Sequence, residues 1–171
     1  MIRVAVLEQS THTEADLGSS NSPTRSRASV PVAAPESVYA ARNALRRIAR
    51  DLALPQRTVE ELAVVISELA TNIMKYASRG RIEVSLTGDL HRGPGIMIIA
   101  EDDAPMFDLA SALPDRTDAG GAIDPARLFG RRGIGSGLGA VARLTDTLTI
   151  GSLPSGGKRI TAVRYARGRR G

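Results

Sequence analysis

Two segments in the first half of the chain carry apolar side chains at the three- and four-residue spacing of an α-helix. The first begins near Pro35 and ends before Pro55, a residue type that breaks helices. The second extends to about Ser78, and Thr58 with Glu61 three residues later predicts a capping box at its start. Each pattern predicts an amphipathic helix with one buried face. The apolar stripes are Val38, Ala41, Leu45, Ile48, Ala49 and Leu52 in the first helix, and Val59, Leu62, Ala63, Ile66, Leu69, Ala70, Ile73 and Ala77 in the second.

The second half of the chain has the patterns of β-strands. Residues Arg81–Thr87 alternate between apolar and polar, and Ile96–Ala100 form a continuous apolar run typical of a central strand. Thr147–Leu153 and Arg159–Tyr165 predict a hairpin around a Gly-containing turn. Between them, Glu101 to about Arg132 has little periodicity, and a segment of that length is usually functional. This order of elements predicts an α+β fold with helices on one face of a mixed sheet.

The N-terminal region differs in composition from the rest of the chain. Gln9–Arg27 are rich in Ser, Thr, Asn and Pro, which predicts disorder. Ile2–Leu7 are either a short strand or part of the same tail, and Ala28–Ala34 have the pattern of an edge strand. We therefore expect an N-terminal tail over 1–34, one domain over 35–165 and a basic tail over 166–171.

The composition excludes several kinds of site. A chain of 171 residues is long enough for one domain with its own core. It has no cysteine, which excludes disulfides, thiolate nucleophiles and Cys-ligated metals. Its two histidines, His12 and His91, argue against a multi-histidine metal centre. No apolar run approaches the roughly 20 residues of a membrane span, so we expect a cytoplasmic protein without membrane contact.

The net charge of +5 raises the question of nucleic acid binding. Four of these charges come from arginines near the C-terminus, and the five aromatic residues are not clustered into a stacking surface. A basic nucleic-acid binder is therefore the weakest of our interpretations. The four arginines are Arg164, Arg167, Arg169 and Arg170.

A polar stripe follows one face of the second predicted helix. Glu68 and Asn72 are four residues apart, so their side chains lie one above the other, and Lys75 continues the same face. A carboxylate there could accept a proton, and an amide oxygen could hold Mg²⁺. The alternative is a solvated helix face with no special role.

Two further features could bind a ligand. Glu101, Asp102 and Asp103 follow the central strand, where ligand contacts are common, although an ordinary acidic turn would look the same. Gly133–Gly139 form a Gly-rich turn before a predicted helix over Leu138–Asp146. Backbone N–H groups at such a turn suit a phosphate, although a flexible turn is the alternative.

Taken in chain order, these features resemble the boxes of the GHKL ATPase superfamily, whose domain is the Bergerat fold. The resemblance is closest to small bacterial anti-sigma factors and serine/threonine switch kinases of the RsbW/RsbT type. Ser67–Ala77 resemble the N-box, Ile98–Pro105 the first glycine box and Gly133–Leu138 the second. The resemblance covers about residues 35–165. It implies a two-layer sandwich with helices on one face of a mixed, mostly antiparallel sheet.

The resemblance also implies a role for each position. Asn72 would hold the Mg²⁺ that bridges the ATP phosphates, Glu68 would be the general base toward an acceptor hydroxyl, and Lys75 would lie near the phosphates. Asp102 would accept a hydrogen bond from the adenine amino group. The loop from about Ala104 to Arg132 would form a lid. The other nucleotide-binding positions would be Ala104, Arg131, Arg132, Gly133, Gly135, Gly137, Leu138 and Lys158.

The implied function is ATP-dependent phosphorylation of a serine or threonine on a STAS-domain antagonist protein, in a bacterial partner-switching pathway. A second partner, either a sigma factor or another effector, and a homodimer are left open. The chain departs from the superfamily at three positions: Ala104 and Met106 replace the glycines of the first box, and Lys158 stands where a threonine is frequent. These departures favour the alternative, a non-catalytic anti-sigma or partner-sequestering module with a weakened nucleotide site.

Overall fold

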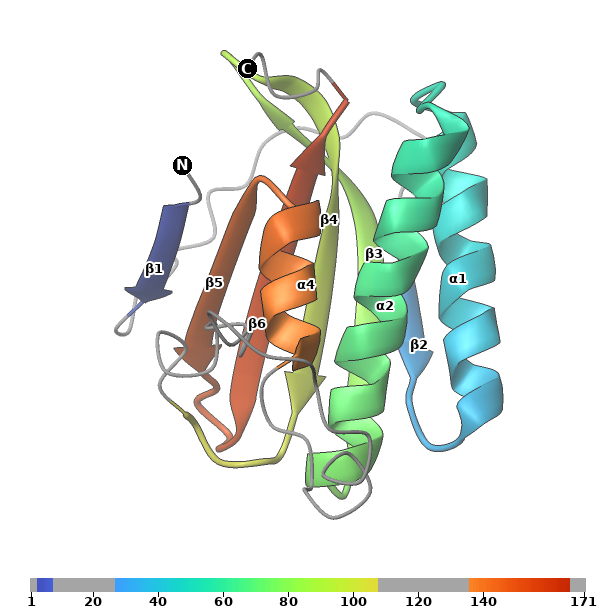
Figure 1. The fold of residues 1–171 in the computed structure, drawn as a ribbon. Coiled ribbons are helices and arrows are strands. Elements are labelled where there is room, and N and C mark those ends of the chain that lie inside the picture. Colours follow the sequence, from blue (N-terminus) through green and yellow to red (C-terminus); the bar gives the residue numbers. More distant parts are fainter. Residues whose placement is uncertain (1–2, 8–26, 108–135, 167–171) are drawn as a thin grey trace, which may run out of the picture.

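The computed structural model describes residues 3–7, 27–107 and 136–166 of the chain (Figure 1). Its strands are β1 (Arg3–Leu7), β2 (Arg27–Pro31), β3 (Gly80–Asp89), β4 (Gly93–Asp102), β5 (Thr147–Ser152) and β6 (Lys158–Tyr165). Its helices are α1 (Pro35–Arg50), α2 (Gln56–Tyr76) and α4 (Ser136–Leu144). The strands form one six-stranded sheet in the order β1-β5-β6-β4-β3-β2.

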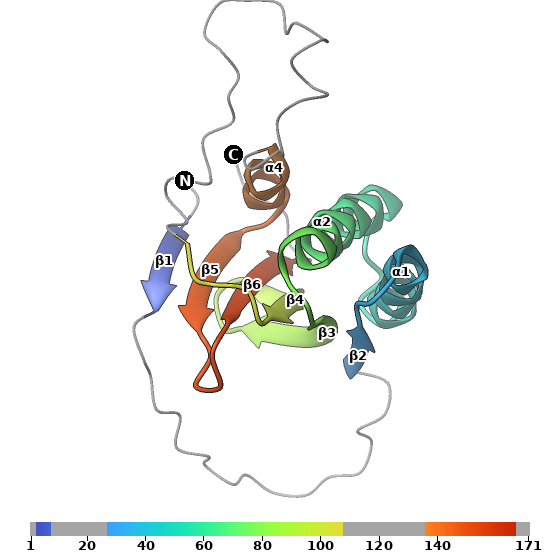
Figure 2. The ribbon, with the colours of Figure 1, turned by 90° about the horizontal axis from the view of Figure 1, so that it is seen from below.

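The three helices cover one face of this sheet (Figures 1 and 2). Among the strands that the structure describes, only β1 and β5 pair in parallel, and the other neighbouring strands are antiparallel. This arrangement confirms the predicted α+β class, a two-layer sandwich of helices on a mixed, mostly antiparallel sheet.

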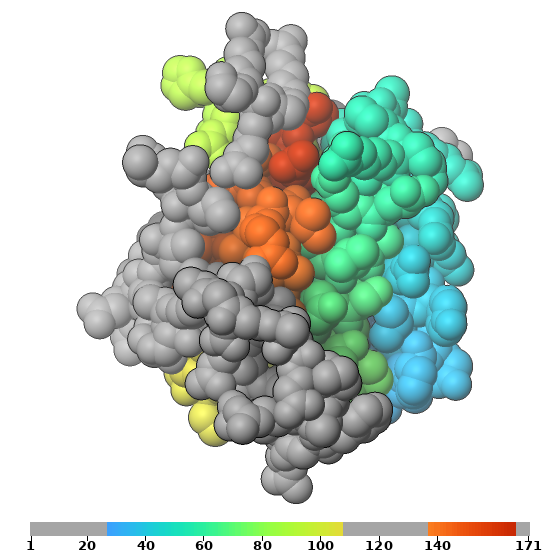
Figure 3. All heavy atoms as spheres, viewed as in Figure 1, coloured from blue at the N-terminus to red at the C-terminus, as the bar shows by residue number. Residues whose placement is uncertain are grey.

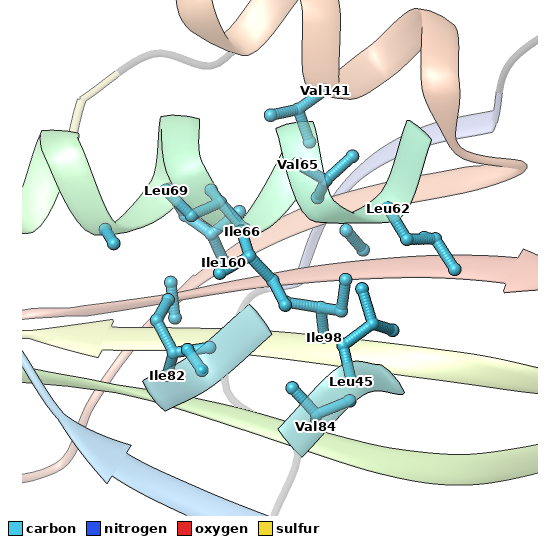
Figure 4. Close-up of a cluster of buried hydrophobic side chains, with 14 of the residues drawn as sticks. Leu45, Leu62, Val65, Ile66, Leu69, Ile82, Val84, Ile98, Val141 and Ile160 are labelled. Carbon is cyan, nitrogen blue, oxygen red and sulfur yellow. The ribbon is translucent and has the colours of Figure 1, made fainter. Parts of the chain in front are cut away.

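The hydrophobic core lies between the two layers (Figure 4). Alternate residues of β4 face the helices, so Ile96, Ile98 and Ala100 are buried in a row. Burial of one Leu or Ile side chain stabilises a fold by about 1.5–3 kcal/mol, so this layer holds the helices on the sheet. The helices contribute mainly Leu45, Leu62, Val65, Ile66, Leu69, Ile73 and Val141, and β3, β5 and β6 contribute Ile82, Val84, Leu148, Ile150 and Ile160.

The predicted capping box at the start of the second helix is wrong. Helix α2 begins at Gln56 with Pro55 as its N-cap residue, and Thr58 lies inside the first turn. The Glu61 carboxylate accepts a bond from Nε of Arg57 at 3.0 Å instead of capping the helix. Proline is well suited to a helix N-terminus because it has no N–H to leave unpaired. Pro55 therefore opens the second helix, whereas the first helix already ends at Arg50 with Asp51 as its C-cap residue.

Two segments of the N-terminal region are strands of the sheet, more than the composition indicated. Arg3–Leu7 is a strand, which settles the question that the sequence left open, and the edge strand is Arg27–Pro31. Most of the segment predicted to be disordered, Gln9–Arg27, lies outside the described residues, and only Arg27 of it is described. Arg164 belongs to β6 and lies near Glu61 and Asp146 at 3.6 and 3.7 Å, so it is not part of a free basic tail.

Candidate functional site

The polar stripe of α2 differs from an ordinary solvated helix face. Glu68, Asn72 and Lys75 form no hydrogen bond or ion pair with any other described residue. The charged groups of the first turns of α2 do have local partners, such as the 3.0 Å bond from Arg57 to Glu61. Glu68 and Asn72 are half-buried, and Lys75 is exposed. The stripe therefore offers a carboxylate, an amide and an ammonium group with no partners inside the described chain.

Glu68 lies against the start of helix α4. A Cβ atom built on Gly137 would be 2.6 Å from Oε2 of Glu68, so only glycine leaves room for the carboxylate in this position. Helix α4 begins at Ser136, two residues earlier than predicted, and Gly137 is therefore in its first turn. A carboxylate beside a helix N-terminus is stabilised by the unpaired N–H groups there. The fold thus brings Glu68 of α2 beside Gly137 of α4.

The end of β4 lies at the same end of the molecule as the C-terminus of α2 and the start of α4, at the bottom of Figure 1. Gly80 makes this approach possible, since a Cβ atom there would lie 2.5 Å from Cγ2 of Ile73 and 3.0 Å from Cβ of Asp102. Asp102 therefore lies close to Ile73, the residue that follows Asn72 in α2. Helices α2 and α4 lie side by side on this face (Figure 3).

Of the three acidic residues after the central strand, only Asp102 faces the helices. Glu101 points to the other face of the sheet and pairs with Arg81 and Arg159, each at 2.5 Å. Asp103 accepts backbone N–H bonds from Ser78 and Arg79 at 2.8 and 3.1 Å, and the Arg79 bond is the main cause that lowers the pKa of Asp103. These two residues therefore have structural partners.

Asp102 and Lys158 form a buried ion pair. Both residues are 6% exposed, and Nζ of Lys158 lies 2.5 Å from Oδ1 of Asp102. The same oxygen accepts the backbone N–H of Ala104 at 2.9 Å. Nζ of Lys158 also lies 5.7 Å from the centre of the Phe107 ring, a contact the sequence did not reveal. The Asp102 carboxylate, which is expected to bind adenine, is therefore already paired with the Lys158 ammonium group.

The replaced glycines of the first box do not strain the backbone. Among the described residues, Ala53 is the only non-glycine residue with a positive φ angle, so Ala104 and Met106 adopt ordinary conformations. The side chain of Ala104 is buried, and that of Met106 is 39% exposed. Neither position requires a glycine in this structure.

Several predicted positions fall elsewhere. Leu138 is buried in the hydrophobic core. Arg131, Arg132, Gly133 and Gly135, like most of the expected lid, lie outside the described residues.

The described residues also bear on metals and membranes. Within them, no group of three or more His, Asp or Glu side chains is arranged to hold a metal ion. No helix in the described ranges combines the length and hydrophobicity that crossing a bilayer requires.

The fold and the similarity of the sequence to known proteins define a class of protein. Residues 32–164 match the histidine kinase-like ATPase domain family, and the chain belongs to this family. The chain is also similar to the serine/threonine-protein kinase RsbT of Bacillus subtilis (strain 168). The two are 33% identical over 132 residues, which make up 76% of this chain and 90% of that relative. These relationships confirm the resemblance to the GHKL superfamily and its RsbW/RsbT-type proteins.

Proposed function

We propose that this protein is an ATP-dependent serine/threonine kinase that phosphorylates a STAS-domain antagonist protein in a partner-switching pathway. The observation that carries the proposal is the position of Glu68, a half-buried carboxylate that lies against Gly137 at the start of α4 and has no partner in the described chain. Similarity to a serine/threonine-protein kinase over nearly its whole length supports the same function.

The residues present fit ATP and Mg²⁺. The unpartnered amide of Asn72 supplies an oxygen ligand of the kind that Mg²⁺ prefers. The exposed ammonium of Lys75, one turn further along α2, can meet a phosphate. The N–H groups at the start of α4 suit an anion as well. When bound, Mg²⁺ would neutralise charge on the phosphates.

In the proposed reaction, Glu68 accepts the proton of the serine or threonine hydroxyl. The hydroxyl oxygen forms a bond to the γ-phosphorus while the bond from that phosphorus to the bridging oxygen of ADP breaks. Lys75 and the N-terminus of α4 offset the negative charge on the transferred group. Phosphoryl transfer requires mainly that the reacting groups are held in line and their charge offset, so positioning of these groups accounts for most of the rate enhancement.

The test is transfer of the γ-phosphoryl group from radiolabelled ATP to a STAS-domain protein of the same organism. Replacement of a general base lowers a rate by about 10²–10⁴-fold, so Glu68→Gln should lose at least a hundredfold while still binding the partner. Glu60→Gln is the matched control, because Glu60 is an exposed carboxylate on the same helix that bonds Gln56. Equal loss in both variants, or no loss in Glu68→Gln, would overturn the assignment.

One observation favours a second function, a non-catalytic module that sequesters a partner such as a sigma factor. Lys158 already pairs with the carboxylate that is expected to read the base. This function predicts a stable complex with the partner, no phosphoryl transfer by the wild-type protein and no effect of Asn72→Ala on that complex.

A further inference from the structure

We infer that Lys158 reads the nucleotide base together with Asp102, and that it makes the site accept guanine about as well as adenine. This inference rests on the proposed nucleotide-binding function of the same site. It concerns which purines the site accepts at Lys158, a position where the chain departs from the superfamily.

The first step is the state of the Asp102 carboxylate. Its side chain is 4% exposed, and Oδ1 is shared by Nζ of Lys158 and the backbone N–H of Ala104. No described residue donates a hydrogen bond to Oδ2. One carboxylate oxygen therefore remains available to accept a bond from a ligand.

The second step is the state of the Lys158 ammonium. Its side chain is 7% exposed, and its bond to Asp102 uses one of the three N–H donors of an ammonium group. The Phe107 ring lies on another side of Nζ, with its centre 5.7 Å away. The described residues supply no further acceptor. A buried cation with unused donors is costly, and a ligand acceptor would compensate it.

The third step is the shape of the two purines. Adenine presents an amino donor at C6 beside the N1 acceptor, whereas guanine presents the O6 acceptor beside an N1–H donor. A pocket with a carboxylate alone accepts the adenine amino group and repels O6. Sites built around one buried hydrogen bond can reject an analogue that cannot make it by about 10⁴-fold.

The Asp102–Lys158 pair changes this selection, because it presents an acceptor and a donor next to each other. Adenine can donate its amino group to Oδ2 and accept at N1 from Nζ. Guanine, with its base turned over relative to adenine, can accept at O6 from Nζ and donate N1–H to Oδ2. Each base leaves neither partner unpaired, so the usual penalty against guanine is removed.

The experiment measures displacement of a fluorescent ATP analogue from the full chain, with Mg²⁺ present, by ATP, GTP and ITP. For the wild-type protein, the Kd values of GTP and ITP should lie within about tenfold of that of ATP. In Lys158→Met the ratio of the GTP Kd to the ATP Kd should rise by at least about tenfold. Arg159→Met is the control, because Arg159 is the next residue but pairs with Glu101 on the other sheet face.

A wild-type protein that prefers ATP over GTP by more than about a hundredfold would overturn the inference, and this comparison needs no variant. An unchanged ratio in Lys158→Met, or the same change in Arg159→Met, would overturn it too. If no purine nucleotide displaces the analogue, or the analogue does not bind, the proposed kinase function fails together with the inference.

Discussion

The Glu68 carboxylate occupies space that a side chain at Gly137 would fill, since a Cβ atom there would be 2.6 Å from Oε2 of Glu68. Glu68 belongs to α2 and Gly137 to α4, and 68 residues of chain separate the two positions along the sequence. The glycine thus lets a general-base candidate lie beside a helix N-terminus. This contact brings together two residues that the sequence places in separate boxes.

Replacement of Gly137 by alanine should lower phosphoryl transfer without lowering the free energy of unfolding. Alanine favours a helix by about 1 kcal/mol over glycine, and the Glu68 side chain can rotate away, so the free energy of unfolding should not fall. Displacement of the carboxylate should lower phosphoryl transfer at least about tenfold, because small misplacements of catalytic groups are costly. Urea unfolding and a transfer assay measure the two effects.

Gly88→Ala serves as the control for that variant, because no atom lies within 4 Å of a Cβ built on Gly88. Its transfer rate should equal that of the wild-type protein. A Gly137→Ala protein with the full wild-type rate would show that the position of Glu68 does not matter for the reaction.

The turn between β5 and β6 offers a matched pair of glycines. Gly156 and Gly157 have φ angles of 84° and 88°, so alanine at either position costs about 1–2 kcal/mol of backbone energy. A Cβ on Gly156 meets nothing, whereas one on Gly157 would collide with the backbone carbonyl of Asp102. Gly157→Ala should therefore destabilise the protein by at least about 1 kcal/mol more than Gly156→Ala in urea unfolding. Equal destabilisation would contradict the close approach of this turn to β4.

Replacement of one member of the Asp102–Lys158 pair should lower the free energy of unfolding more than replacement of both members. Lys158→Met leaves a buried carboxylate without its cation, and such changes cost about 3–5 kcal/mol. The double variant Asp102→Asn with Lys158→Met removes both charges and should recover more than half of that loss. Free energies of unfolding for the single and double variants form a double-mutant cycle. Strict additivity in this cycle would show that the two groups do not interact.

Asp103 should make stability depend on pH in the acid range. Its backbone bonds from Arg79 and Ser78 lower its pKa in the folded protein below the ordinary value of 3.8. A group with a depressed folded pKa stabilises the fold above its unfolded pKa, and this contribution disappears as the pH falls through the folded pKa. Wild type should therefore be more stable than Asp103→Asn at pH 7, and the difference should shrink progressively below about pH 4. A constant difference across this range, measured by urea unfolding, would rule out the ionised carboxylate as its source.

The sequence predicted the helices, the main strands and the polar stripe because each is encoded by a local period. The alternation of β4 side chains between the two faces of the sheet also predicts that Glu101 and Asp102 face opposite ways. Ile98 and Ala100 face the core, so Asp102 must face it too, and Glu101 must face the other way. The prediction treated the three acidic residues as one group and did not use the two-residue period of the strand.

The Asp102–Lys158 pair could not be predicted in the same way. The two residues are 56 positions apart, and they meet because β4 and β6 pair in a register that places them opposite each other. No local pattern encodes the register between two distant strands. The capping box failed for a different reason, because Pro55 opens α2 by itself and Glu61 pairs with Arg57.

The most direct test of the kinase site is calorimetric binding of ATP with Mg²⁺ to the wild-type protein and to Asn72→Ala. The Asn43→Ala variant is the control, because Asn43 is an exposed amide on α1 whose partner is Arg46. The account predicts that wild type and Asn43→Ala bind ATP with Mg²⁺ and that Asn72→Ala does not. Absence of binding to the wild-type protein at millimolar ATP, or equal binding by Asn72→Ala, would contradict it.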